Sequence, residues 1–328
     1  MYKGLITINY MPIQLMVSGD PVIRVIRIRR RKKGLLPIIL LIITFVTVWL
    51  TGLALSQGYY EIIGASSTLT VYLWSLLYAI IFLIVLGSHE YGHILASRKY
   101  SIPISGPYFI PAPPAQLGFI GTLGSLISME GLPPNRRSLI LLGLSGPLAG
   151  FLAGLVFSII GIQLSEVLPS EEVKELIMEG KAEGIPFMPL ILIFLTSLRG
   201  VGEGSTLLIH PIAFVGFVIF LVTFINLMPI GQLDGGHVVR AFTSAKTHNF
   251  IGYLVIILLI IVGLLTSLYG GSYIYFMIAI ILGFFKMVFG SRLHPGPANG
   301  FSKLEKKDHI YLLIYITLVI ATMPIPIM

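Results

Sequence analysis

The sequence predicts an all-α polytopic membrane protein with about seven transmembrane helices, a three-helix core and a small embedded β or re-entrant segment. Apolar residues make up 55% of the 328 residues and charged residues only 11%, whereas a soluble domain usually carries about 25% charged residues. Because this apolar excess is more than one soluble core can bury, lipid is the expected solvent. Seven runs are long enough to cross a bilayer, at about 35–55, 68–95, 139–162, 210–229, 250–268, 272–290 and 310–327.

Residues 1–34, which precede the first run, are expected to form a basic cytoplasmic segment. They carry eight of the 22 Lys and Arg residues, and basic residues beside a span favour the cytoplasmic side and anionic lipid. No aromatic-interleaved basic domain accompanies them, so we expect no nucleic-acid partner. Apolar and polar residues alternate on both sides of Ser18-Gly19-Asp20, which predicts a small hairpin, with a disordered tail as the alternative.

The distribution of basic residues also predicts the topology of a multi-pass integral membrane protein. A cytoplasmic N-terminus places 19 Lys and Arg residues inside and only Lys174, Lys181 and Arg199 outside. The apolar stretch 188–198 is too short to cross and is expected to dip into the membrane or lie on it. The predicted regions are the basic segment 1–34, the first span with its outer loop at 35–67, a core at 68–240, and a C-terminal three-span region at 241–328.

The second run ends in LGSHEYGHILASRKY, which contains the strongest candidate for chemistry. In a helix, His89 and His93 lie on one face, so both imidazoles can reach a single Zn²⁺, and Glu90 beside them can accept a proton from water at the metal. Ionisable residues inside a span are costly and are therefore functional candidates by default. The alternative, a pair of structural histidines with a neutralised glutamate, would place three polar side chains in lipid without a task.

A catalytic zinc site needs a third protein ligand and one open position. Asp234 follows the fourth run in INLMPIGQLDGGHVVRA, and in the predicted topology the second and fourth runs both end at the cytoplasmic side. Asp234 and the HEYGH motif are therefore expected to meet near that side. Glu203 is the competing third ligand, but it falls on the outer side. His237 is interpreted as a residue behind the ligands or on the surface.

The end of the fourth run carries a polar residue and helix breakers. Asn226 can donate a hydrogen bond to a substrate carbonyl or to the oxyanion formed from it, with a simple helix-end asparagine as the alternative. Pro229 and Gly231 break the helix before Asp234, and broken backbone at membrane depth is tolerated where it lines a polar cavity. The break is expected to let Asp234 turn toward the metal.

Two further segments are expected to shape the site. The third run carries Gly143, Gly146, Gly150 and Gly154 at close to one-turn spacing, which allows tight helix contact and is equally typical of generic packing in lipid. The Gly- and Pro-rich stretch at about 105–130 predicts a partly embedded strand or hairpin that offers backbone groups to an extended peptide. An ordinary cytoplasmic loop is the alternative.

Three motifs occur in order: HEYGH at 89–93, GPLAG at 146–150 and NLMPIGQLDG at 226–235. Together they resemble the site-2 protease family of intramembrane zinc metalloproteases, over roughly residues 68–240, and look most like its archaeal and plastid branch. The resemblance implies one zinc ion held by His89, His93 and Asp234, with Glu90 as general base and Asn226 as a substrate-side group. It also implies that Gly146, Gly150 and Pro229 serve packing or substrate binding.

The implied substrates are membrane-anchored proteins, cleaved within or beside their spanning helices in the lipid bilayer. Other functions stay open at this point. They are a gluzincin-type protease with Glu203 as ligand, a transporter that uses the same residues as a pathway, and a catalytically inactive homologue. The donor set would also bind Co²⁺ or Mn²⁺.

Overall fold

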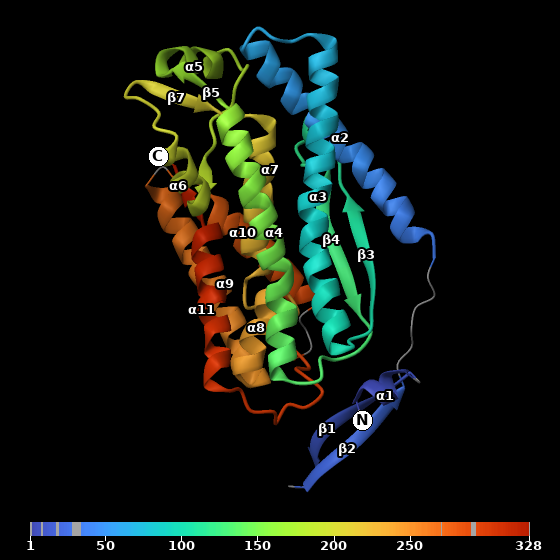
Figure 1. Cartoon of the computed structure of the whole chain (residues 1–328). Coiled ribbons are helices and arrows are strands. Elements are labelled where there is room, and N and C mark those ends of the chain that lie inside the picture. The colour runs from blue at the N-terminus through green and yellow to red at the C-terminus, as the bar shows by residue number, and fades with distance from the viewer. Residues whose placement is uncertain are drawn as a thin grey trace.

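The computed structural model describes residues 2–7, 9–17, 20–27, 34–269, 271–289 and 293–327, and the chain is mostly helical, as predicted (Figure 1). The long helices begin and end close to the predicted apolar runs. The helices of nine or more residues are α2 (Leu36–Ile62), α3 (Thr68–Tyr100), α4 (Arg136–Leu164), α5 (Ser170–Met178), α6 (Leu190–Leu198), α7 (Pro211–Asn226), α8 (Asp234–Phe242), α9 (Ala245–Leu268), α10 (Ile274–Phe289) and α11 (His309–Thr322). The short helix α1 spans Tyr2–Thr7, and single 3₁₀ turns are η1 (Ala115–Leu117) and η2 (Lys306–Asp308).

Four of the described helices, α2, α3, α4 and α9, are long and apolar enough to cross a membrane, and α7 and α10 are shorter apolar helices. This set confirms the class of a polytopic, mostly helical protein. The count of seven crossings stays a prediction. The stretch at 188–198 contains α6, a helix of nine residues, which is too short to cross alone.

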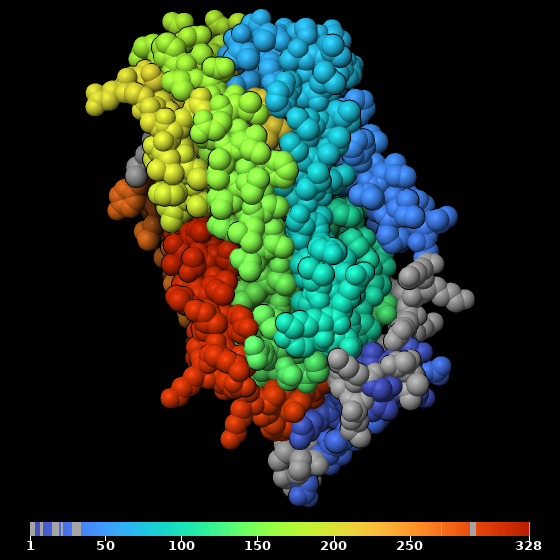
Figure 2. All heavy atoms as spheres, in the orientation of Figure 1, coloured from blue at the N-terminus to red at the C-terminus, as the bar shows by residue number. Residues whose placement is uncertain are grey.

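Helix α4 stands between α3 and α11 on the face shown in Figure 2 and packs closely against α3 and α7. The main core lies between α3 and α7 and includes the fully buried Tyr78 and Phe220. Gly154 permits the close approach of α4 to α7, because a methyl group there would lie 2.6 Å from Cγ2 of Ile219. Large apolar side chains such as Leu73, Ile84 and Leu152 face outward, as expected for helices surrounded by lipid.

The hairpin predicted between the second and third runs is present. Strands β3 (Ile104–Pro111) and β4 (Thr122–Met129) pair antiparallel, and they lie beside α3 and α2 in Figure 1. The hydroxyl of Thr47 on α2 donates to the carbonyl of Gly121 at 2.6 Å, which ties the hairpin to that helix. The depth of the hairpin in the membrane stays a prediction.

Three more antiparallel pairs consist of short strands at the two ends of the helices. The N-terminal hairpin pairs β1 (Tyr10–Val17) with β2 (Asp20–Arg27), so the predicted strands are present, whereas Ser18, Gly19 and the basic run 29–33 lie outside the described residues. The other pairs join β5 (Glu166–Pro169) to β7 (Ser205–Leu208) and β6 (Phe187–Pro189) to β8 (Pro324–Pro326).

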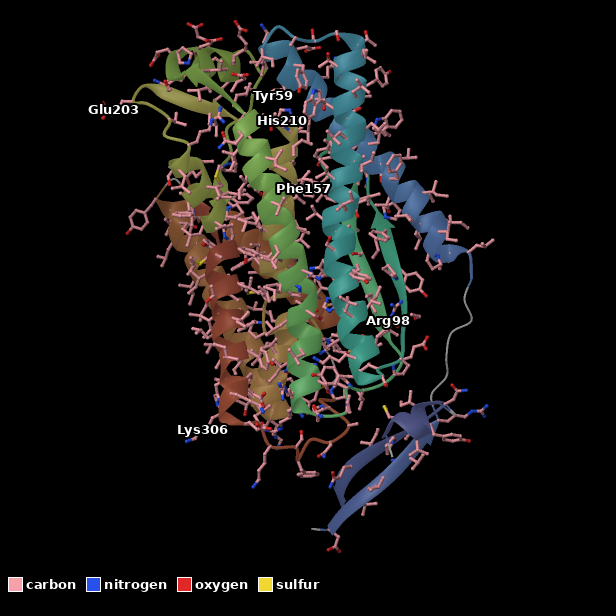
Figure 3. The ribbon with its side chains drawn as sticks, in the orientation of Figure 1. Tyr59, Arg98, Phe157, Glu203, His210 and Lys306 are labelled. Carbon is pink, nitrogen blue, oxygen red and sulfur yellow. The ribbon has the colours of Figure 1, made fainter. Side chains whose placement is uncertain are left out.

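Three labelled side chains that were predicted on opposite sides of the membrane lie at opposite ends of the molecule. Figure 3 places Glu203 at the end that holds α5 and β7, and places Arg98 and Lys306 toward the other end. These three residues therefore lie at the ends to which the predicted topology assigns them, and the topology itself stays a prediction.

Candidate metal centre

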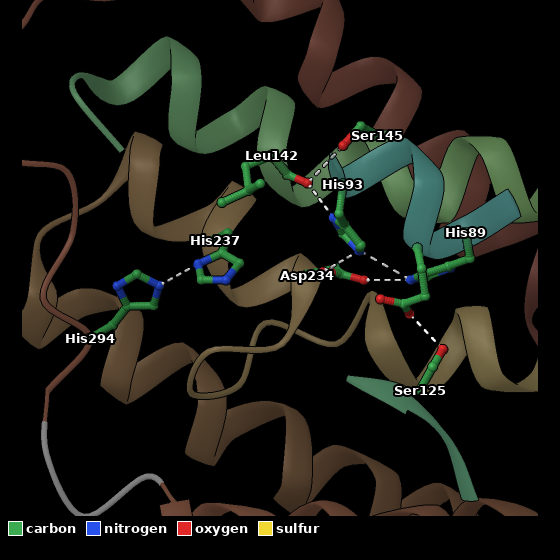
Figure 4. A network of polar contacts seen from close by, with 9 residues as sticks. His89, His93, Ser125, Leu142, Ser145, Asp234, His237 and His294 are labelled. Atoms are coloured by element: carbon green, nitrogen blue, oxygen red, sulfur yellow. Dashed lines mark hydrogen bonds and ion pairs between the residues drawn. The ribbon is translucent and has the colours of Figure 1, made fainter. Parts of the chain in front are cut away.

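The HEYGH motif lies near the C-terminal end of α3, inside the protein. His89 and Glu90 are each 3% exposed and His93 is 8% exposed. The helix begins at a cap in which the Ser67 hydroxyl accepts the Thr70 amide, and it continues five residues beyond the predicted end of the span, to Tyr100. This long regular helix fixes the four-residue spacing of the two histidines on one face (Figure 4).

Asp234 reaches the same place from a different direction. Helix α7 ends at Asn226, and α8 begins at Asp234 itself. Gly231, between them, has a left-handed φ of 55°, a conformation that glycine adopts at little cost. The predicted break in the helix is therefore present, and it turns the carboxylate of Asp234 toward the two histidines.

The side chains of the three predicted ligands lie within contact distance of one another. His89 Nε2 is 3.2 Å from His93 Nε2, Asp234 Oδ2 is 3.3 Å from His89 Nε2, and Asp234 Oδ1 is 3.3 Å from His93 Nε2. A tetrahedral zinc site with bonds of about 2.0–2.1 Å has ligand atoms roughly 3.4 Å apart. The spacing of these atoms therefore fits a zinc ion, and this is the one group among the described residues with three such ligands in reach.

The hydrogen bonding of His93 presents the correct nitrogen to a metal. Its Nδ1 lies 2.9 Å from the Leu142 carbonyl oxygen on α4, and a carbonyl can only accept, so Nδ1 carries the proton. The Nε2 lone pair is then free to bind a metal. His89 Nδ1 is buried without a hydrogen-bond partner among the described residues.

The small-residue stripe of α4 lies directly against this cluster. A methyl group on Gly146 would overlap Nε2 of His93, and one on Gly150 would lie 3.0 Å from Cβ of His89. One on Gly143 would lie 2.5 Å from the Asp234 carbonyl oxygen. The glycines therefore let α4 pack against α3 and α8 at the site itself.

Glu90 is oriented by a residue that the sequence did not single out. The Ser125 hydroxyl on β4 donates to Glu90 Oε1 at 2.7 Å, while Glu90 Oε2 is buried with no partner among the described residues. A buried carboxylate oxygen without a donor is costly unless water or a ligand reaches it. This arrangement leaves one oxygen of Glu90 able to accept a proton.

A cavity of about 420 Å³ opens beside the cluster. Its lining includes Glu90, Asn226 and Asp234 as well as residues 125–129 of β4. Pro229 is buried and is not among the lining residues. The cavity therefore brings the predicted ligands, the predicted base and Asn226 to one space bordered by a strand.

The two other residues considered in the sequence, Glu203 and His237, lie outside the cluster of three predicted ligands. Glu203 lies at the far end of the molecule (Figure 3), so it is no ligand of this cluster. His237 is 5% exposed and lines the cavity, so of its two predicted positions the one on the surface is wrong, and the one behind the ligands stays open. It forms a hydrogen bond with His294. The position of His294 in the sequence matches no metal-ligand motif.

The electrostatics of the site favour an ionised Asp234 and neutral side chains at His237 and His294, the two histidines outside the ligand cluster. Burial opposes ionisation of Asp234, but the imidazoles of His93 and His89 outweigh it and hold the pKa of Asp234 below its usual range. Burial lowers the pKa of His237 to about 4 and the pKa of His294 to about 2. These two imidazoles are therefore uncharged at neutral pH.

Comparisons with known proteins agree with this geometry. Residues 77–270 match the model of peptidase family M50. The chain is 31% identical over 175 residues to "Probable zinc metalloprotease EGY2, chloroplastic" of Oryza sativa subsp. indica, covering 53% of this chain and 30% of the relative. It is 27% identical over 169 residues to the Arabidopsis thaliana protein of the same name, covering 52% and 29%.

A third relative is "Probable zinc metalloprotease EGY1, chloroplastic" of Arabidopsis thaliana, 29% identical over 156 residues that cover 46% of this chain and 27% of the relative. The chain thus matches less than a third of the length of each of these curated relatives. No solved structure matches the chain significantly.

Proposed function

The chain belongs to peptidase family M50, and from this premise we propose that it is an intramembrane zinc metalloprotease that hydrolyses peptide bonds of membrane-anchored proteins. The membership confirms the resemblance to site-2 proteases. The observation that carries the proposal is the cluster of His89, His93 and Asp234 beside the half-satisfied carboxylate of Glu90. The names of the plastid relatives support the choice of zinc.

In the proposed reaction His89, His93 and Asp234 hold the metal, and Glu90 is the general base. When bound, zinc supplies the Lewis acidity that makes water an effective nucleophile near neutral pH. Glu90 accepts the proton of the attacking water at Oε2, because Oε1 is engaged by Ser125. Asn226, at the cavity wall, donates a hydrogen bond to the substrate carbonyl as negative charge develops on it.

We propose that the substrate lies along β4 as an added strand. Among the described residues the sheet consists of β3 and β4 alone, so the second edge of β4 has no strand partner. That strand contributes residues 125–129 to the cavity wall, and strand addition holds a peptide extended with its carbonyl groups exposed. A helical substrate must therefore unwind locally before it is cleaved.

The proposed membrane arrangement follows the charge distribution. We infer a cytoplasmic N-terminal segment at 1–34, a catalytic core at 68–240 and seven crossings, in which α7, α10 and α11 cross as shorter helices. Lys306 and Lys307 in η2 and Arg24 and Arg27 in β2, which all belong to segments predicted inside, support this orientation. The metal centre, near the C-terminal end of α3, would then lie toward the cytoplasmic side.

A direct test uses the purified chain in detergent with a reporter that contains one membrane-spanning segment. We expect cleavage with new termini within or beside the span, loss of cleavage after chelation, and recovery when Zn²⁺ is restored. A transporter built from the same residues would instead give ion flux in proteoliposomes and leave the reporter intact. That second outcome would overturn the proposal.

Helix breakers in the substrate are expected to accelerate cleavage. Pro or Gly in a spanning helix lowers the cost of local unwinding by about 1–3 kcal/mol relative to Ala, which corresponds to roughly 5- to 150-fold in rate if unwinding precedes cleavage. The measurement compares two reporters that differ only in a Gly-Pro pair replaced by Ala-Leu. Equal rates for the two reporters would contradict docking as an extended strand.

A further inference from the structure

Two buried histidines outside the ligand cluster form a hydrogen-bonded pair that borders the cavity. His237 lies on α8, one turn after Asp234, and His294 lies between α10 and η2. Each is 5% exposed, and Nδ1 of His237 is 2.8 Å from Nε2 of His294 (Figure 4). Neither belongs to the group that could hold the metal, and the proposed reaction leaves both without a task.

The backbone beside His294 determines which nitrogens carry protons. The Gly296 amide donates to His294 Nδ1 at 2.9 Å, so this nitrogen is an acceptor and His294 carries its proton on Nε2. That Nε2–H then donates to Nδ1 of His237. With Nδ1 acting as an acceptor, a neutral His237 carries its own proton on Nε2.

The segment that contains His294 contacts α8 through hydrogen bonds and close packing. Arg240 donates from Nε to the His294 carbonyl at 3.3 Å and from Nη1 to the Thr243 carbonyl at 2.7 Å. Gly296 has a φ of 76°, and a methyl group there would lie 2.7 Å from Nη2 of Arg240. The Gly296 amide, which determines the tautomer of His294, therefore belongs to a segment that is packed against Arg240 of α8.

The second ring nitrogen of His237, Nε2, is not engaged by His294, and the side chain of His237 forms part of the cavity wall. His237 lines the same cavity as Glu90, Asn226 and the ligands. The two ring nitrogens of an imidazole point to different sides, so engagement of Nδ1 by His294 leaves Nε2–H for a partner on the other side of the ring. A peptide substrate presents backbone carbonyl oxygens there, and each of them accepts hydrogen bonds.

We propose that His237 is a further catalytic residue, whose Nε2–H donates a hydrogen bond to a main-chain carbonyl oxygen of the substrate peptide in the cavity. His294 is the positioning residue that fixes the tautomer of His237. Without His294, His237 would also populate the tautomer that turns a lone pair toward the carbonyl oxygen. The inference rests on the proposed protease function for its substrate but not for its tautomers.

The tautomers are tested without catalysis, on metal-free protein that carries ¹⁵N-labelled histidine. Two-bond ¹H–¹⁵N correlation spectra distinguish the two neutral tautomers, and the variants His237→Gln and His294→Gln assign the signals. We expect His294 and His237 both to be protonated at Nε2, and His237 to become a mixture of tautomers in His294→Leu. A His237 protonated at Nδ1 in the wild-type chain would overturn the inference, whether or not the chain cleaves peptides.

The role of the donor is tested by kinetics on the reporter span. We expect His237→Leu to lose about 2- to 13-fold in kcat/KM, which corresponds to the usual worth of one hydrogen bond between neutral groups, while it keeps its zinc. His237→Gln, whose amide also donates, should recover most of the loss, and His294→Leu should fall between the two. A His237→Leu variant with wild-type kcat/KM, or a His237→Gln variant as poor as His237→Leu, would contradict the proposal.

His248→Leu is the matched control. His248 is a buried histidine whose ring centroid lies 5.4 Å from that of His294, yet it is not among the lining residues of the cavity. Its Nε2 has no hydrogen-bond partner among the described residues, so leucine removes no bond made by that nitrogen. We expect wild-type kcat/KM for this variant. A loss equal to that of His237→Leu would show a general packing effect and would overturn the specific role of His237.

Discussion

Replacing Glu90 with glutamine is expected to reduce cleavage by about 10²- to 10⁴-fold, the usual contribution of a general base, without loss of the metal. The amide has nearly the same shape as the carboxylate but accepts no proton from water. Zinc is expected to remain at one ion per chain, because the proposed ligands are His89, His93 and Asp234. Cleavage of the reporter span and metal analysis on the same preparation give both quantities.

Glu203→Gln is the control for that substitution. It makes the same chemical change at the opposite end of the molecule, so we expect wild-type cleavage and wild-type zinc content. If Glu90→Gln cleaved as fast as the wild type, Glu90 would not be the base. If Glu90→Gln lost its zinc, Glu90 would be a ligand and the assignment of Asp234 would need revision.

A single methyl group on Gly146 is expected to abolish zinc binding and activity together. The added carbon would occupy the position of His93 Nε2, so either the imidazole must rotate away from the metal or α4 must move away from α3. Overpacking of this kind typically costs about 1–3 kcal/mol in folding free energy. Metal analysis, thermal unfolding and reporter cleavage of Gly146→Ala separate loss of the site from loss of the fold.

Gly87→Ala makes the same substitution on α3, half a turn before the HEYGH motif. A methyl group at Gly87 meets no atom within 4 Å, so this variant should bind zinc and cleave the reporter as the wild type does. Alanine is also the better helix former. Equal behaviour of Gly146→Ala and Gly87→Ala would show that the α4 stripe does not set the geometry of the ligands.

The sequence was sufficient to predict the parts of the site that depend on local spacing. His89 and His93 share a face because any regular helix places residues four apart on one side. The break before Asp234 follows from Pro229 and Gly231, whose backbone preferences are local as well. Long apolar runs likewise predicted α2, α3, α4 and α9, because the length of a span is set by bilayer thickness.

The contacts made between distant segments were not predictable in the same way. Ser125 meets Glu90 across 35 positions of the chain, and this contact depends on how the β3–β4 hairpin packs against α3. His294 meets His237 across 57 positions. Neither residue belongs to a motif, so only the tertiary packing identifies them. Helix α3 ends at Tyr100, the last residue of the stretch LGSHEYGHILASRKY, five residues beyond the apolar run at about 68–95.

The zinc content of the purified Asp234→Ala variant tests the account most directly, measured beside the wild type and Glu203→Ala. We predict one zinc ion per chain in the wild type and in Glu203→Ala, and a content well below one in Asp234→Ala after dialysis against a weak chelator. Full retention of zinc by Asp234→Ala, with loss in Glu203→Ala, would contradict the account, because the metal would then be held by a different set of ligands.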